Sequence, residues 1–174
     1  MGISLEQFNA ATEEFKSAVT EGHMSLTEMY RKVIAKLTLN IPAEKVMEKH
    51  KKLYITHATT RDEEIIALIE ELKINYQVVC LTNTEKEIAE YNKEYGLFQY
   101  FEKAFLSCEM KIKKPNLLIY KKVLQECNCP AEEALFIDDN EEYADGAVEA
   151  GLNVILFHNK KQLMKDLEIL GILF

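Results

Sequence analysis

Apolar residues in the first third of the chain recur at helical spacing. Between residues 5 and 19 they are three or four positions apart, which predicts a helix with one apolar face. That face holds Leu5, Phe8, Ala11, Phe15 and Val19. Two more amphipathic helices begin near Ser25 and near Pro42, and Gly22 ends the first. Three short helices of this kind predict a small bundle that needs a further apolar cover.

The pattern changes after residue 57. A helix over Arg61–Leu72 is followed by Tyr76–Leu81, a short apolar run rich in β-favouring residues, which predicts a buried strand. Helices and strands then alternate. The later strands are predicted at Ala104–Leu106, Ala134–Ile137 and Asn153–Phe157. This alternation indicates an α/β fold with a parallel sheet between helices, so the chain divides into a helical lobe of residues 1–57 and an α/β core of residues 58–174.

Charge and composition narrow the choice of partners and location. The formal net charge is −8, which disfavours nucleic acid and anionic membrane as partners. No apolar run is long enough to span a bilayer, and the first residues lack the features of a signal peptide. The four cysteines have no spacing typical of a disulfide framework or a metal site, which predicts a cytoplasmic protein.

The first candidate site follows the predicted strand that ends at Leu81. Open α/β sheets bind ligands at the carboxyl ends of their strands, and here Thr82, Asn83 and Thr84 come next. A hydroxyl, an amide and backbone N–H groups at a helix start can cradle a phosphate. The alternative is an ordinary helix start, in which Thr84 and Glu87 form a capping box and bind no ligand.

The second candidate is Lys114, which stands directly before Pro115. Proline suits the first turn of a helix, so the lysine is predicted at the mouth of that helix. Its charge can neutralise a phosphate or hold a carboxylate there. The alternative is a surface lysine without a ligand, since most lysines are of that kind.

The third candidate is the pair Asp138–Asp139, at the end of an apolar strand. Carboxylates in such a place need a cation or hydrogen-bond donors to offset their desolvation. Hard oxygen ligands suit Mg²⁺, whose shell is completed by phosphate oxygens and water. The alternative is a helix cap by Asp139 or Asn140, with Asp138 solvated.

Taken in their order along the chain, the three candidate sites resemble the motifs of the haloacid dehalogenase-like (HAD-like) hydrolase superfamily. The resemblance is to the branch of that superfamily with a helical cap. The motifs that carry the resemblance lie between residues 76 and 157. It implies a Rossmann-like core in which Thr82 and Asn83 bind phosphate. It implies that Lys114 is catalytic, steadying the nucleophile and the phosphate, and that Asp138 and Asp139 hold Mg²⁺, with Asp139 as the main ligand.

Two features depart from the family pattern. The family's chemistry begins with an Asp-x-Asp motif after a central first strand, and its first aspartate attacks phosphorus. None of the five aspartates here is in such a motif, and Tyr143 stands where the family usually has Asp or Asn. The sequence thus predicts that the central strand and its nucleophile are missing, as if about 20 residues had been removed. Two strand edges would then lack a partner.

The resemblance implies a Mg²⁺-dependent phosphatase for a small phosphomonoester, inactive as this chain because the nucleophile is missing. The acidic pair favours phosphoryl chemistry over dehalogenation. The alternative is a degenerate, non-catalytic HAD-like protein that binds a partner or an anion. This alternative predicts a homo-oligomer or a strand-completing partner that covers the open edges. A receiver-type signalling domain fits poorly, because its acidic pair comes early in the chain and its lysine last.

Overall fold

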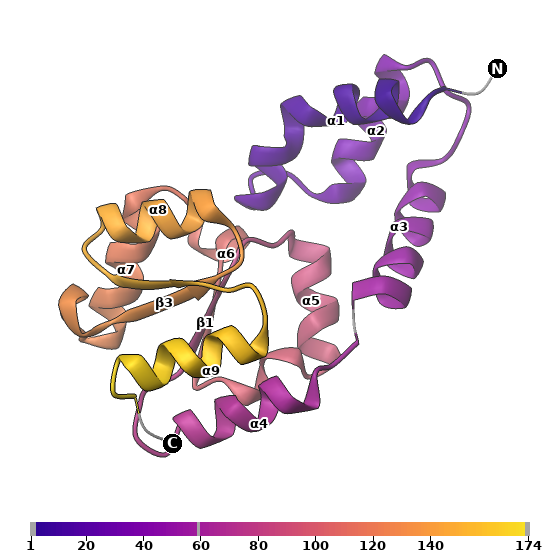
Figure 1. The fold of residues 1–174 in the computed structure, drawn as a ribbon. Helices are drawn as coiled ribbons and strands as arrows, with labels where there is room; N and C mark the ends of the chain where they lie inside the picture. The colour runs from indigo at the N-terminus through magenta and orange to yellow at the C-terminus, as the bar shows by residue number, and fades with distance from the viewer. Residues whose placement is uncertain (1–2, 59, 173–174) are drawn as a thin grey trace. The chain divides into compact units, whose positions relative to one another are not determined.

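The computed structural model describes residues 3–58 and 60–172, with an all-helical start followed by helices and short strands (Figure 1). Packing groups these residues into two units. The first unit holds the described residues of Met1–Arg61 together with Asn83–Leu97 and Leu106–Lys111. The second holds Asp62–Thr82, Phe98–Phe105 and the described residues of Ile112–Phe174.

The first unit is built mainly from helices. They are α1 (Leu5–Thr20), α2 (Leu26–Lys36), α3 (Ala43–Ala58), α5 (Lys86–Glu94) and the short α6 (Ser107–Met110). Ser4 and Gln7 form a capping box at the start of α1, and Ser25 caps α2. The predicted apolar stripes meet in one core, in which Val19 and Val33 are almost fully buried. Ile88 of α5 belongs to the same core, so α5 supplies part of the cover that the three N-terminal helices need.

The turn between α1 and α2 packs against α6. Gly22 has a φ of +67°, and a Cβ there would lie 2.1 Å from the carbonyl oxygen of Cys108. Ser107 is fully buried, and its hydroxyl donates to the carbonyl of Thr20 at 2.7 Å. Only glycine accepts this combination of backbone conformation and close approach without strain.

The second unit is α/β. Its helices are α4 (Glu63–Leu72), α7 (Leu117–Cys127), α8 (Glu141–Glu149) and α9 (Lys160–Ile169). Its strands are β1 (Val79–Thr82), β2 (Lys103–Leu106, whose last residue belongs to the first unit), β3 (Leu135–Asp138) and β4 (Asn153–Leu156). Two 3₁₀ turns, Leu97–Tyr100 and Ala131–Glu133, precede β2 and β3. Helices α4 and α9 pack on one face of β4, and α7 and α8 lie on the other side of the strands (Figure 1).

The strands form two separate pairs. β3 and β4 are parallel, with Leu135 opposite Asn153 and Asp138 opposite Leu156. β1 pairs with β2, and no ladder joins the two pairs within the described residues. The predicted α/β fold with parallel strands is confirmed. The central strand that the sequence predicts to be missing between β1 and β3 stays a prediction.

Two further expectations concern the whole chain. The division into a cap of residues 1–57 and a core of residues 58–174 stays a prediction, because packing groups α5 and α6 with the N-terminal helices. Within the described ranges, no helix is both long and apolar enough to cross a membrane.

Candidate functional site

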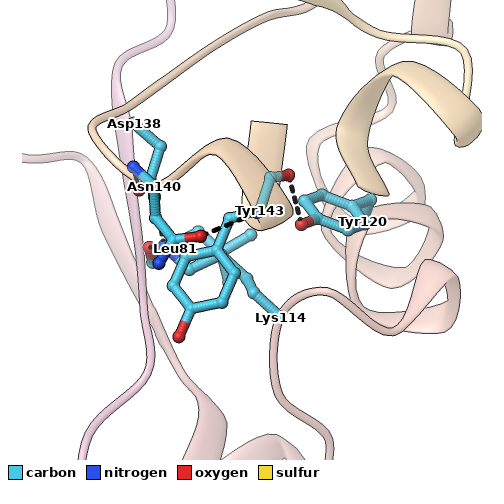
Figure 2. Close-up of polar contacts among 6 residues, drawn as sticks. All are labelled: Leu81, Lys114, Tyr120, Asp138, Asn140 and Tyr143. Carbon is cyan, nitrogen blue, oxygen red and sulfur yellow. Dashed lines mark hydrogen bonds and ion pairs between the residues drawn. The ribbon is translucent and has the colours of Figure 1, made fainter. Parts of the chain in front are cut away.

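Lys114 is the centre of the charged groups at the strand ends of the second unit. Only 6% of this lysine is exposed, although it lies in the loop before α7. Its ammonium group donates to the carbonyl oxygen of Leu81 in β1 at 3.1 Å, and to Oδ2 of Asp138 at the end of β3 at 2.5 Å. Figure 2 shows these three residues gathered around the lysine Nζ. One side chain therefore links the carboxyl ends of two strands that share no ladder.

Aromatic rings enclose the ammonium group as well. Its nitrogen lies 4.8 Å from the ring centroid of Tyr143 and 5.4 Å from that of Phe136. A cation near a ring face is stabilised by the quadrupole of the ring, most strongly where water is excluded. The residue that departs from the family pattern, Tyr143, thus contributes directly to the surroundings of Lys114.

The carboxylate of Asp138 is held in a fixed orientation. Its Oδ2 accepts from Lys114, while its Oδ1 accepts from the backbone N–H of Asn140 at 3.0 Å. The side chain is 11% exposed, so both charges of the ion pair are largely withdrawn from water. A buried pair of this kind is costly to break, because the remaining charge would have no partner.

The start of α8 is fixed by two further hydrogen bonds. Asn140 caps the helix by accepting from the backbone N–H of Tyr143 at 3.1 Å. The hydroxyl of Tyr120 donates to the carbonyl of Tyr143 at 2.7 Å (Figure 2). Burial, and secondly the negative charge of Asp138, raise the pKa of Tyr120, so this hydroxyl remains protonated and keeps donating.

Asp139 is exposed, and it follows β3 directly. No group of three or more His, Cys, Asp or Glu side chains that could hold a metal ion occurs in the described part of the chain. Mg²⁺ is usually bound by one or two carboxylates, with water and phosphate oxygens in its other positions. Asp138 and Asp139 supply adjacent carboxylates, which are the type of ligand that Mg²⁺ takes, so the two residues fit this ion chemically.

The loop after β1 is organised differently from the prediction. Thr82 is the last residue of β1 and half-buried, whereas Asn83 belongs to the first unit. The predicted capping box of Thr84 and Glu87 is wrong. The backbone N–H of Thr84 donates to the buried hydroxyl of Ser107 at 2.9 Å, and α5 begins after Glu85 without a side-chain cap. The phosphate-binding roles of Thr82 and Asn83 stay predictions.

The loop before α7 differs as well. The cap of this helix is Asn116, and Pro115 lies just before the cap instead of in the first helical turn. The Lys114–Pro115 peptide bond is cis. Lys114 is nevertheless next to the helix start, as predicted. Its contact with Asp138 brings two of the candidate residues together. The catalytic and phosphate-binding roles of Lys114 remain predictions.

Sequence reasoning missed three members of the site. The carbonyl of Leu81 is a backbone group, and no residue pattern marks it. Tyr120 lies on the apolar face of a helix, where a core role is the usual interpretation. Cys80 is the third: burial raises the pKa of its thiol to about 11, with the charge of Lys114 acting in the opposite direction. Only the charge of Lys114 and the place of Cys80 next to Leu81, the end of the predicted strand, could have suggested that the two are neighbours.

In open α/β sheets, ligands bind at the carboxyl ends of the strands, which is where Lys114 and Asp138 lie here. The family model for haloacid dehalogenase-like hydrolases matches residues 3–151, which is most of the chain. The chain therefore belongs to the haloacid dehalogenase-like hydrolases.

Similar proteins of known name cover this chain to different extents. Drimenol cyclase drtB from Aspergillus calidoustus is 33% identical over 67 residues, which are 38% of this chain. That stretch spans only 13% of the cyclase. The activity of the longer protein therefore gives no direct assignment for this chain.

Solved structures show the same fold at lower identity. A HAD family enzyme from Bacteroides thetaiotaomicron superposes with a TM-score of 0.71 at 18% identity, covering 94% of this chain and 92% of the other. A predicted HAD-like family hydrolase from Porphyromonas gingivalis gives a TM-score of 0.73 at 18% identity, covering 96% and 88%. The Bacteroides enzyme was also solved in complex with magnesium and inorganic phosphate.

Proposed function

We propose that the chain is the phosphate- and Mg²⁺-binding part of a hydrolase for small phosphomonoesters. The observation that carries the proposal is the buried pair of Lys114 and Asp138 at the ends of β1 and β3. A buried cation at the carboxyl ends of strands is suited to the negative charge of a phosphoryl group. The magnesium and phosphate bound by the Bacteroides relative support the same ligands here.

The residues divide the binding of phosphate and Mg²⁺ between them in this proposal. Lys114 offsets the charge of the phosphate, while the Thr82 hydroxyl and the Asn83 amide donate hydrogen bonds to its oxygens. Asp139, with Asp138 beside it, holds Mg²⁺. When bound, Mg²⁺ supplies charge neutralisation of the phosphate oxygens. Lys114 also orients Asp138, because the ion pair fixes one of its two oxygens.

Turnover needs a nucleophile that none of these residues supplies. No aspartate in the printed sequence is in an Asp-x-Asp motif, so we propose that this chain binds phosphate and Mg²⁺ without hydrolysing an ester. We place the protein in the cytoplasm, where its four free cysteines would stay reduced.

Calorimetric titration of the chain with inorganic phosphate, with and without Mg²⁺, tests the proposal. We expect phosphate to bind measurably only when Mg²⁺ is present. Asp139→Asn should weaken that binding at least about tenfold, because one charged ligand of the cation becomes neutral. Asp145→Asn is the matched control, since Asp145 is an exposed aspartate on α8. Equal binding by wild type and Asp139→Asn would reject Asp139 as a ligand.

A non-catalytic binding protein is the second candidate, and the position of Tyr143 favours it. Its ring lies over the Lys114 ammonium group, where a phosphate would otherwise approach. Tyr143→Asn places the residue type of the family at this position. If wild type binds no phosphate and Tyr143→Asn does, the ring blocks the site and the non-catalytic reading is correct. If Tyr143→Asn binds phosphate no differently from wild type, the position of the ring no longer favours the non-catalytic candidate.

A further inference from the structure

A groove in the second unit lies along the edge of β4, and the proposed phosphate and Mg²⁺ site does not use it. Its volume is about 420 Å³. Val154 and Leu156 line it from β4, and Gln162, Asp166 and Ile169 line it from α9. Sites for small molecules usually have volumes of roughly 300 to 1,000 Å³ and combine apolar surface with a few polar groups. The groove therefore has the size and composition of a small-molecule site.

The edge of β4 that borders the groove carries backbone groups without a strand partner. Asn153 and Phe157, at either end of β4, donate their backbone N–H groups toward β3 at 3.0 and 2.8 Å. Backbone groups of successive strand residues point to alternate sides, so those of Val154 and Leu156 point away from β3. Within the described residues β4 pairs with β3 alone. The N–H and the carbonyl of Val154 therefore face the groove.

Gln162 covers the other part of this edge. Its side-chain amide nitrogen donates to the carbonyl of Leu156 at 3.1 Å and to Oδ2 of Asp166. Its Oε1 accepts from the backbone N–H of His158 at 2.9 Å. A continuous strand ladder along β4 would need the carbonyl of Leu156, which is already used. The groove is therefore suited to a small molecule in preference to a further strand.

Asp166 gives the groove a negative charge. The residue is partly buried, and its Oδ2 accepts from Gln162. No described residue donates to its Oδ1 or forms an ion pair with it. Hydrogen bonds between a carboxylate and a cationic donor are about twice as strong as neutral ones. Asp166 therefore favours a ligand that carries an ammonium group.

The apolar surface of the groove lies at the end of α9. Ile169 is 71% exposed and Leu170 is 52% exposed, and both line the groove. Ile155, which lines it from β4, is 5% exposed. An aliphatic or aromatic group placed here would remove apolar surface from water, which favours binding. The ligand thus needs an apolar body next to its ammonium group.

We propose that this groove binds a small primary amine with an apolar body, of the arylalkylamine type. The ammonium group donates to Oδ1 of Asp166 and to the carbonyl of Val154, while the body covers Ile169 and Leu170. The groove shares no residue with the proposed phosphate and Mg²⁺ site. The inference therefore goes beyond the proposed function and does not depend on it.

NMR titration of the full chain at neutral pH tests the inference. The probe is phenethylamine, and 2-phenylethanol is the neutral probe with the same apolar body. Shifts of the backbone amides locate the bound probe, and their dependence on concentration gives the dissociation constant. Asp166→Asn removes the charge with little change in shape. Glu168→Gln is the matched control, since Glu168 is an exposed carboxylate on the same helix and does not line the groove.

We expect phenethylamine to bind wild type at least about tenfold more tightly than 2-phenylethanol. The amides of Val154, Gln162 and Asp166 should shift together, because the three residues line one groove. Asp166→Asn should weaken the binding of phenethylamine about tenfold and leave that of 2-phenylethanol unchanged. Glu168→Gln should bind phenethylamine as wild type does.

Other results would overturn the inference. Equal affinities of wild type for the two probes would mean that the ammonium group is not recognised. Equal weakening in Asp166→Asn and Glu168→Gln would mean general attraction of a cation to an acidic chain. Absence of shifts in β4 and α9 at about 10 mM phenethylamine would mean that the groove is not a binding site. A dimer by light scattering, with the Val154 amide protected from hydrogen exchange before any probe is added, would make a second copy the occupant.

Discussion

Lys114 has the chemistry of a surface residue, yet its environment is that of a core residue. It is 6% exposed and joined to Asp138, and the rings of Tyr143 and Phe136 lie on the same ammonium group. Desolvating a lysine and an aspartate is costly, and the ion pair with its additional hydrogen bonds offsets that cost only while both partners are present. The sequence marks Lys114 as a candidate, but its burial depends on residues distant in the chain.

Replacing Lys114 with methionine should destabilise the protein strongly. Asp138 would remain largely buried without its cation, and removing one partner of a buried pair costs about 3 kcal/mol or more. Urea unfolding followed by circular dichroism measures the free energy of unfolding. Lys113→Met is the matched control, because no ion pair involves this neighbouring lysine among the described residues, and its stability should stay near that of wild type. Equal stability of the two variants would contradict the importance of the pair.

The Cys80 thiol should make stability depend on alkaline pH. Burial raises its pKa from 9.0 to about 11, so the unfolded chain loses this proton at a lower pH than the folded chain. The contribution of the protonated thiol to the free energy of unfolding is therefore fully present below pH 9. It is lost as the pH rises through about 11. Urea unfolding of wild type and Cys80→Ala, with reductant, should show wild type losing stability faster across this window. Parallel pH profiles would show that Cys80 has no such effect.

At the scale of elements, the periodic segments were predictable and their ends were not. The helix over Arg61–Leu72 and the strand after Tyr76 are observed within a few residues of their predicted bounds, as α4 and β1. The predicted cap at Thr84 failed because the buried hydroxyl of Ser107, 23 positions away, takes the backbone N–H of Thr84. Local capping rules describe an isolated helix start, and here a long-range hydrogen bond replaces the local one.

The turn at Gly22 gives a prediction at this scale. Gly22→Ala should destabilise by more than about 2 kcal/mol, since it adds a clash with the carbonyl of Cys108 to the strain of a positive φ. Gly171→Ala isolates the strain alone. Gly171 has a similar φ of +70°, but nothing lies within 4 Å of its added Cβ, so about 1 kcal/mol is expected. Thermal unfolding measures both variants, and equal losses would mean that the turn does not depend on contact with α6.

At the scale of the molecule, the two packing units divide the predicted α/β segment. Helix α5 follows β1 in sequence, yet its Ile88 belongs to the core of α1, α2 and α3. The charged groups around Lys114 all belong to the second unit, with Leu81 and Asp138. The alternation of helices and strands predicted the class of fold, but it could not show which unit each helix would pack against.

Net charge gives the prediction for the whole chain. With a formal charge of −8, the protein should pass unretained through heparin at low salt and should not sediment with vesicles rich in anionic lipid. A lysine-rich protein of similar size is the positive control for both assays. Retention that disappears as salt is raised would reveal a local basic surface and would contradict the exclusion of nucleic acid and membrane as partners.

The sequence by itself determined the α/β class, the order of helices and strands, and the candidate residues at the strand ends. These depend on periodicity and on residue type, which are local properties of the chain. Only the tertiary structure decided that Lys114 is buried against Asp138 and the carbonyl of Leu81, and that β1 and β3 belong to separate sheets. Burial and strand pairing depend on which distant segments meet, and residue pattern alone does not specify those contacts.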